Sequence, residues 1–153
     1  MKNFNILFLI LMTFPLNSYV LDNYDKNHTD DILGEWHTQS RDSIIEIYRD
    51  GASYGGKVVW TKNPTDENGE PRKDHLNPDP AKRDNHFVGT VIMTGFTFDN
   101  EDLWKDGELY DLTHGKTYKA QITLEDSNTL KMRGYLATPF FGKTVTWKRK
   151  GSI

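Results

Sequence analysis

Apolar and polar residues alternate along most of the chain after residue 31, and this pattern predicts strands rather than helices. The segment Lys116–Leu124 shows it clearly, because every second residue from Tyr118 to Leu124 is apolar or aromatic while the residues on the other face are Thr117, Lys119, Gln121 and Thr123. Such alternation is typical of an antiparallel sheet with one packed and one solvated face. No segment repeats apolar residues at helical spacing for long enough to predict a major helix.

Eight strands are expected: Leu33–Thr38, Ser43–Arg49, Ser53–Trp60, Phe87–Thr94, Glu108–Asp111, Lys116–Leu124, Thr129–Leu136 and Lys143–Arg149. Asp50-Gly51 forms the clearest hairpin turn, and Asp106-Gly107 and His114-Gly115 are further expected turns. Short links favour sequential antiparallel pairing, and eight strands can close on themselves. The fold class is therefore all-β, an eight-stranded antiparallel up-and-down barrel with one long ordered loop.

That loop runs from Thr61 to His86 and is rich in proline. Asp79 stands where a helix N-cap belongs and Pro80 where the first helical residue belongs, so a short helical turn is expected through Arg83. Asn77 and Asp79 are expected to be structural, since they can accept hydrogen bonds from backbone N–H groups. Arg83 is the functional candidate, able to grip a carboxylate or phosphate. The alternative is that Arg83 only fastens the loop to a carboxylate or carbonyl of the barrel.

The first and last predicted strands each carry a short motif that contains a tryptophan. Gly34-Glu35-Trp36 begins the first strand, and Trp147-Lys148-Arg149 ends the last. This resembles the calycin and lipocalin arrangement, in which a basic side chain covers the tryptophan of a Gly-x-Trp motif. The resemblance implies that the predicted barrel is lipocalin-like. Arg149 is therefore expected to lie over Trp36 as a cation–π lid. The alternative is an ordinary core tryptophan near a surface arginine.

A resemblance to a known family covers almost the entire chain after the N-terminal segment. The motifs, in order, are "GEWHT", "IEIYRDGASYGGKVVWTKNP", "NPDPAKR", "DGELYDLTHGKTYKA", "MRGY" and "GKTVTWKR". Their series is similar to that of an exported bacterial family catalogued as domain of unknown function 2147. The resemblance implies a small, β-rich exported protein and implies no established activity. The chain departs from the family at "YDLTHG", where a proline more usually follows the aspartate, and this affects a turn.

The N-terminus predicts export. Met1-Lys2 precedes an apolar run and then Asn17-Ser18, which is the pattern of a signal peptide over residues 1–18. Residues 19–31 are expected to be a flexible lead, and residues 32–150 a single barrel domain. The protein is therefore expected to be periplasmic or secreted. No later segment approaches the length that a membrane-spanning helix needs.

Composition excludes several classes of function. The chain has no cysteine, which excludes disulfides, thiol nucleophiles and Cys-ligated zinc. Its formal net charge of −3 gives no reason to expect a nucleic-acid partner. Gly51–Gly55 matches the G-x-S-x-G of serine hydrolases, but it spans a hairpin, without the strand-to-helix turn on which that motif depends.

Two polar clusters contain side chains that could form a chemical site. The first lies on the long loop and consists of possible metal ligands: His75, Asp79, Asp84 and His86. The simpler interpretation is that they are solvated turn residues. The second is a group of acidic residues near Trp104: Asp99, Glu101, Asp102 and Asp106. Their closeness in sequence favours a solvated hairpin tip over a pair of catalytic carboxylates. No catalytic residue, metal or cofactor is predicted.

The many aromatic residues on predicted strands carry the functional hypothesis. Tyr54, Trp60, Tyr110 and Tyr118 are expected to line a pocket for a small apolar or amphipathic molecule, which is anionic if Arg83 contacts its head group. One alternative is a filled barrel that interacts with an envelope protein, and another is a hydrolase in the barrel mouth. An interior cavity of several hundred cubic ångströms would favour the ligand binder.

Overall fold

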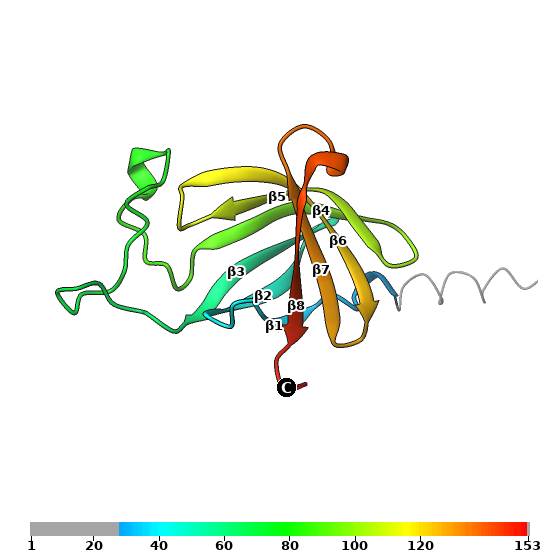
Figure 1. Ribbon diagram of the computed structural model, residues 1–153, viewed down its shortest axis with the longest axis horizontal. Coiled ribbons are helices and arrows are strands. Elements are labelled where there is room, and N and C mark those ends of the chain that lie inside the picture. The colour runs from blue at the N-terminus through cyan, green and yellow to red at the C-terminus, as the bar shows by residue number, and fades with distance from the viewer. Residues whose placement is uncertain (1–27, 153) are drawn as a thin grey trace, which may run out of the picture.

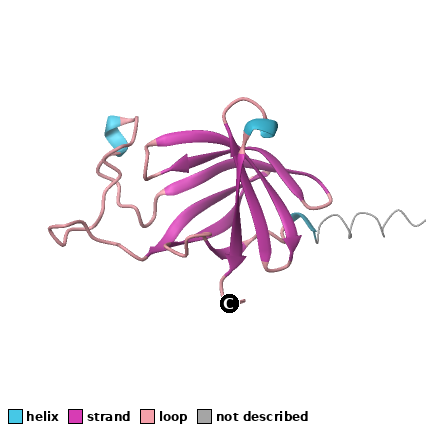
Figure 2. Cartoon of the chain, viewed as in Figure 1, coloured by secondary structure: helices cyan, strands magenta, loops and turns pink. Residues whose placement is uncertain are grey.

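The computed structural model describes residues 28–152. Its strands are β1 Gly34–His37, β2 Ser43–Asp50, β3 Ser53–Thr61, β4 Val91–Asn100, β5 Leu103–Asp111, β6 Lys116–Asp126, β7 Thr129–Tyr135 and β8 Lys143–Arg149. Each strand pairs antiparallel with the next, and β1 also pairs with β8, which closes the barrel (Figures 1 and 2). The predicted eight-stranded antiparallel up-and-down barrel is confirmed.

Three predicted strand boundaries are wrong by more than two residues. β4 runs from Val91 to Asn100, not from Phe87 to Thr94, and β5 begins at Leu103, not Glu108. The expected turn at Asp106-Gly107 lies inside β5, where the pairing register shifts and Asp106 takes a φ of 61°. The ring of Phe96 occupies the space that a Cβ at residue 107 would need, so this dipeptide forms a bulge over a core ring. The real hairpin turn is Glu101-Asp102.

One end of the barrel is closed by buried aromatic side chains. Trp36, Trp104, Tyr54 and Phe96 are almost fully buried. Residues 28–33 lie across this end and accept hydrogen bonds from it: Trp36 Nε1 donates to the Ile32 carbonyl at 2.9 Å and Trp104 Nε1 to the Thr29 carbonyl at 3.2 Å. Residues 28–31 thus belong to the closure, although the sequence assigns them to the lead.

Arg149 completes the closed end, as the Gly-x-Trp pattern predicts. Its guanidinium carbon lies 4.2 Å from the ring centroid of Trp36, which confirms the cation–π contact. Its Nε donates to the Ser127 carbonyl at 2.6 Å, Nη1 to the Leu33 carbonyl at 2.8 Å and Nη2 to the Asp31 carbonyl at 2.6 Å. Gly34 allows this approach, because its φ is +117° and a Cβ there would lie 3.1 Å from Nη1.

The long loop between β3 and β4 is ordered, as predicted, and includes the short helix η1, Pro80–Lys82. Asp79 caps η1 by accepting from Ala81 N at 3.0 Å, and Asn77 Oδ1 accepts from Asp79 N at 2.9 Å. Asp74 is 1% exposed and accepts from Asn77 Nδ2 at 2.6 Å and from the Tyr110 hydroxyl at 2.8 Å. A buried carboxylate therefore connects this loop to β5.

The predicted signal peptide and residues 19–27 of the predicted lead lie outside the described residues. Within residues 28–152, no helix is both long enough and apolar enough to cross a membrane.

Candidate functional site

The end of the barrel opposite Arg149 holds a cavity of about 660 Å³. The β1–β2, β5–β6 and β7–β8 connections surround its mouth. Alternation along the strands turns apolar side chains into its depth: Ile45, Val58, Ile92, Leu109, Met132, Val145 and Trp147. The barrel is thus packed at one end and hollow at the other, and the cavity has the size of ordinary small-molecule sites, which span roughly 300–1,000 Å³.

The rim of this cavity is polar, and its carboxylates already have donors. Asp42 Oδ1 accepts from Thr38 Oγ1 at 2.9 Å. Burial raises the pKa of Asp42, but hydrogen bonds from Ser40 and Thr38 outweigh it, so that pKa lies below its ordinary value. Asp111 contacts His114 Nδ1 at 2.7 Å and accepts from the Thr113 N–H at 2.8 Å. The carboxylates of Asp42 and Asp111 therefore already have hydrogen-bond partners within the protein.

Two lysines at the same rim have no such partner. Lys116 and Lys143 both line the cavity and are exposed. Neither forms an ion pair within residues 28–152, whereas other lysines, such as Lys131 with Glu125, do. The cavity therefore combines an apolar interior with two available positive charges at its entrance.

The structure separates the four aromatic residues that the sequence assigns to the pocket. Tyr118 lines the cavity, and Tyr110 lies at its edge with its hydroxyl turned toward Asp74. Tyr54 is at the closed end, where its hydroxyl donates to Asp30 at 3.1 Å. Trp60 pairs with Ile44 on the outer surface and is 43% exposed.

Trp60 faces outward because of a bulge. Ile45 pairs with Val58, but its neighbour Ile44 pairs with Trp60, so one extra residue of β3 reverses the alternation. Ile45 and Val58 belong to the core cluster, and Ile44 does not. The side chain of Trp60 consequently lies outside the lumen.

Arg83 lies at the C-terminal end of η1, and its contact is not the barrel contact of the alternative hypothesis. Its Nε donates at 2.8 Å to the carbonyl of Asn77, which belongs to the same loop. It lines neither the lumen nor the hollow beside η1, which Asn77, Asp79 and Lys82 line instead. Asn77 and Asp79 have the hydrogen bonds expected of structural residues.

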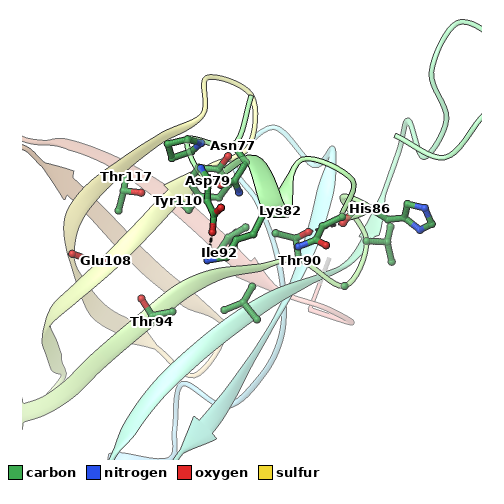
Figure 3. A pocket seen from close by; sticks show the side chains of 15 residues that line it. Asn77, Asp79, Lys82, His86, Thr90, Ile92, Thr94, Glu108, Tyr110 and Thr117 are labelled. Atoms are coloured by element: carbon green, nitrogen blue, oxygen red, sulfur yellow. Dashed lines mark hydrogen bonds and ion pairs between the residues drawn. The ribbon is translucent and has the colours of Figure 1, made fainter. Parts of the chain in front are cut away.

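That second hollow, of about 740 Å³, lies between the long loop and strands β4 to β6 (Figure 3). Polar side chains dominate its labelled lining, among them Thr94, Glu108 and Thr117 from the strands and His86 from the loop. Lys82 Nζ lies 3.8 Å from Asp79 Oδ2, so the charge of Lys82 already has an ion-pair partner. The lumen, with its deeper apolar wall and unpaired lysines, is the stronger candidate site.

The serine of the G-x-S-x-G match and the possible metal ligands of the long loop form no shared site in the structure. Ser53 follows the hairpin turn at the closed end, and its hydroxyl donates to the Asp50 carbonyl at 2.9 Å. Asp84 contacts Lys73 at 3.1 Å, and Asp79 caps η1. Across the described residues, no group of three or more His, Asp or Glu side chains converges to hold a metal ion.

Sequence reasoning missed the rim lysines, although a signal for them exists. Lys116 continues the alternation of Tyr118, and Lys143 continues that of Val145 and Trp147. Both lie one step beyond the apolar run of their strands. Extending the alternation by one residue would have placed both at the lumen entrance.

Comparisons with known proteins agree with this architecture. The solved structure of protein HP1028 from Helicobacter pylori, described as belonging to the lipocalin family, matches with a TM-score of 0.70 and 24% identity, covering 79% of this chain and 84% of that one. A redesigned β-barrel matches with a TM-score of 0.43 and 13% identity, covering 80% of this chain and 95% of that one. No curated protein matches significantly.

The lipocalin-like character expected of the fold is thereby confirmed. The family model described as "Uncharacterized protein conserved in bacteria (DUF2147)" matches residues 34–149, which extend from the Gly-x-Trp glycine to the arginine that covers the tryptophan. The chain accordingly belongs to this bacterial family, domain of unknown function 2147.

Proposed function

We propose that the protein binds a small amphipathic anion, with its apolar part in the lumen and its charged head group at Lys116 and Lys143. The observation that carries this proposal is the cavity of about 660 Å³, apolar in its depth and bordered by two lysines without ion-pair partners in the described chain. Burial of an alkyl chain supplies affinity at about 0.8 kcal/mol per CH₂ group. Two ammonium groups supply preference for an anion, because Asp42 and Asp111 already have donors.

The lipocalin-like barrel supports small-molecule binding in general, since barrels of this size can hold one small ligand. The hollow half of the interior favours this function over the alternative of a filled barrel that only contacts other proteins. The hydrolase alternative has less support, because Ser53 is at the opposite end from the cavity mouth.

Calorimetric titration with three amphiphiles of equal chain length tests the proposal: dodecanoate, dodecanol and dodecyltrimethylammonium. We expect dodecanoate to bind most tightly. The double variant Lys116→Gln/Lys143→Gln should raise its Kd by about tenfold, the effect of losing roughly 1.4 kcal/mol from a charge-assisted contact. The same variant should leave dodecanol binding unchanged. Lys62→Gln, at an exposed lysine that lines neither hollow, is the matched control.

A second variant tests the lumen itself. Val145→Phe places extra volume inside the cavity and should weaken dodecanoate and dodecanol together, with thermal melting measured alongside to confirm that the variant folds. Failure of all three amphiphiles to bind the wild-type protein would overturn the proposal. Equal affinity for dodecanoate and dodecyltrimethylammonium would remove the assignment of Lys116 and Lys143 to an anionic head group.

We also propose that the protein acts outside the cytoplasm, in the periplasm or after secretion. The support is the sequence of residues 1–18, with a charged start, an apolar run and a small polar exit.

A further inference from the structure

The loop between β7 and β8 exposes three large apolar side chains. Leu136, Phe140 and Phe141 are 75%, 82% and 81% exposed, the highest values among the large hydrophobic residues of the described chain. The two phenylalanine rings pack edge to face, with centroids 4.9 Å apart. We call these three residues the apolar tip. In Figure 1 the loop that carries it, with η2 (Pro139–Phe141), rises from the barrel at the top of the view.

Arg133 fixes the loop that carries the apolar tip. Its Nε donates to the Pro139 carbonyl at 2.5 Å, its Nη2 to the Phe140 carbonyl at 3.1 Å and its Nη1 to Thr144 Oγ1 at 2.8 Å. A Cβ at Gly142 would lie 2.7 Å from the Gly134 carbonyl oxygen, so the two sides of the loop meet closely. The exposed rings are therefore presented by an ordered loop, which reduces the entropy lost when they become buried.

The ionisable side chains next to the apolar tip in the sequence are basic, although the whole chain is formally −3. Residues 132–147 form the β7–β8 loop and the adjoining strand segments, and they contain no Asp or Glu but include Arg133 and Lys143. Arg133 and Lys143, which border the loop, form no ion pair within residues 28–152. Apolar rings bordered by unpaired cations match the interface of an anionic bilayer.

We propose that the apolar tip docks the protein on the surface of a membrane that contains anionic phospholipids. Phe140 and Phe141 enter the boundary between head groups and acyl chains, while Lys143 contacts lipid phosphates and Arg133, which holds the loop, adds positive charge. A protein partner fits less well, because a stable interface needs about 800 Å² on each side and the tip is a single short loop.

Docking also brings the lumen entrance close to the bilayer. Gly134 and Lys143, at the two ends of the β7–β8 connection, both line the cavity. The docking itself does not depend on a lumen ligand. If the proposed function also holds, an amphipathic molecule can pass between lipid and lumen over a short distance.

Vesicle co-sedimentation tests the proposal, with vesicles of phosphatidylcholine alone and of phosphatidylcholine mixed with phosphatidylglycerol. The wild-type protein should bind the mixed vesicles more strongly, and added salt should weaken that binding. Phe140→Ser/Phe141→Ser should lower the partition coefficient by about tenfold or more, since each phenylalanine loses apolar burial. Lys143→Gln should lower it by about fivefold.

Leu76→Ser/Val88→Ser is the matched control, because both residues are exposed and apolar but lie on the long loop. It should sediment as the wild type does. Absence of binding to the mixed vesicles would overturn the proposal, as would an equal loss in this control. Self-association that depends on Phe140 and Phe141, without vesicle binding, would identify the apolar tip as a contact between copies and would also overturn it.

Dodecanoate titration in the absence of vesicles separates the two proposals. Phe140→Ser/Phe141→Ser should bind dodecanoate as the wild type does, because neither ring lines the cavity. Vesicle binding by a protein that fails to bind any amphiphile in its lumen would leave docking intact and remove only the proposed function.

Discussion

Arg149 joins three parts of the chain at the closed end, and its removal should destabilise the fold measurably. Its three hydrogen bonds to the carbonyls of Asp31, Leu33 and Ser127 contribute about 0.5–1.5 kcal/mol each. The cation–π contact with Trp36 adds about 0.5–1 kcal/mol. Burial opposes these gains, since it lowers the pKa of Arg149 by disfavouring the charged guanidinium, although Asp31 partly compensates.

We therefore expect Arg149→Ala to lower the free energy of unfolding by about 2–3 kcal/mol, which corresponds to a melting temperature lower by roughly 10 °C. Arg149→Lys keeps the charge but cannot donate to three carbonyls at once, so it should still cost about 1 kcal/mol or more. Urea unfolding followed by circular dichroism measures both effects, and an unchanged m-value would show that the shift reflects stability.

Lys62→Ala is the control for removing an exposed cation and should change stability by less than about 0.5 kcal/mol. A comparably small change in Arg149→Ala would refute the reasoning, because it would mean that the three carbonyls and Trp36 gain nothing from the guanidinium. If Arg149→Lys had the same free energy of unfolding as the wild type, a positive charge alone would account for the stabilisation and the planar geometry of arginine would be irrelevant.

Four further predictions concern Asp79 and Arg83 of the long loop, Tyr110 and export. Asp79→Ala removes the cap of η1 and should lower stability by about 1 kcal/mol in urea titration. Arg83→Ala should cost a similar amount because its Nε bonds to a carbonyl; unchanged melting with weaker dodecanoate binding would instead make Arg83 a ligand contact. Burial and the hydrogen bond to Asp74 raise the pKa of Tyr110 to about 12. Its neutral form therefore stabilises the fold fully below pH 10, this contribution is lost as the pH rises from 10 to 12, and Tyr110→Phe should abolish that loss in stability measured against pH. N-terminal sequencing of protein from its native host should begin at Tyr19, and a start at Met1 would exclude cleavage of the predicted signal peptide.

The closed barrel could be predicted because its evidence is local and repeats in every strand. Alternation in Lys116–Leu124 identifies the packed face without knowledge of its partners. The contact between Trp36 and Arg149 was predictable from the resemblance at the chain ends, and it places the first strand beside the last. The N-cap at Asp79 is equally local, because a capping side chain bonds within two or three residues of itself.

The errors occur where distant residues decide the local geometry. Asp106-Gly107 has the composition of a turn, but Phe96, from the neighbouring strand, makes it a bulge. Trp60 continues the alternation of β3 in the sequence, yet a bulge opposite Ile44 and Ile45 turns it outward. An extra residue in one strand is visible only when its partner is known, so alternation alone cannot reveal it.

The sequence also could not predict which end of the barrel is open. Residues 28–31 are polar and charged, and nothing in their order predicts that they bond to Trp104 and close this end of the barrel. Two of their closing contacts are made by backbone carbonyls, which accept from Arg149 and Trp104, and another is made by the Asp30 carboxylate, which accepts from Tyr54. Any residue type supplies such a carbonyl, so composition carries no signal for it.

The closure by residues 28–33 has a consequence for how stability and binding are divided. The hydrogen bonds of Trp36, Trp104 and Arg149 lie at one end of the barrel, whereas the cavity entrance with Lys116 and Lys143 lies at the other. Because Lys116 and Lys143 are exposed and form no ion pair within residues 28–152, their substitution should alter affinity with little effect on unfolding. Substitution of Arg149 should do the reverse. Such separation allows a rigid closed end to support an entrance whose lysines keep their charges available.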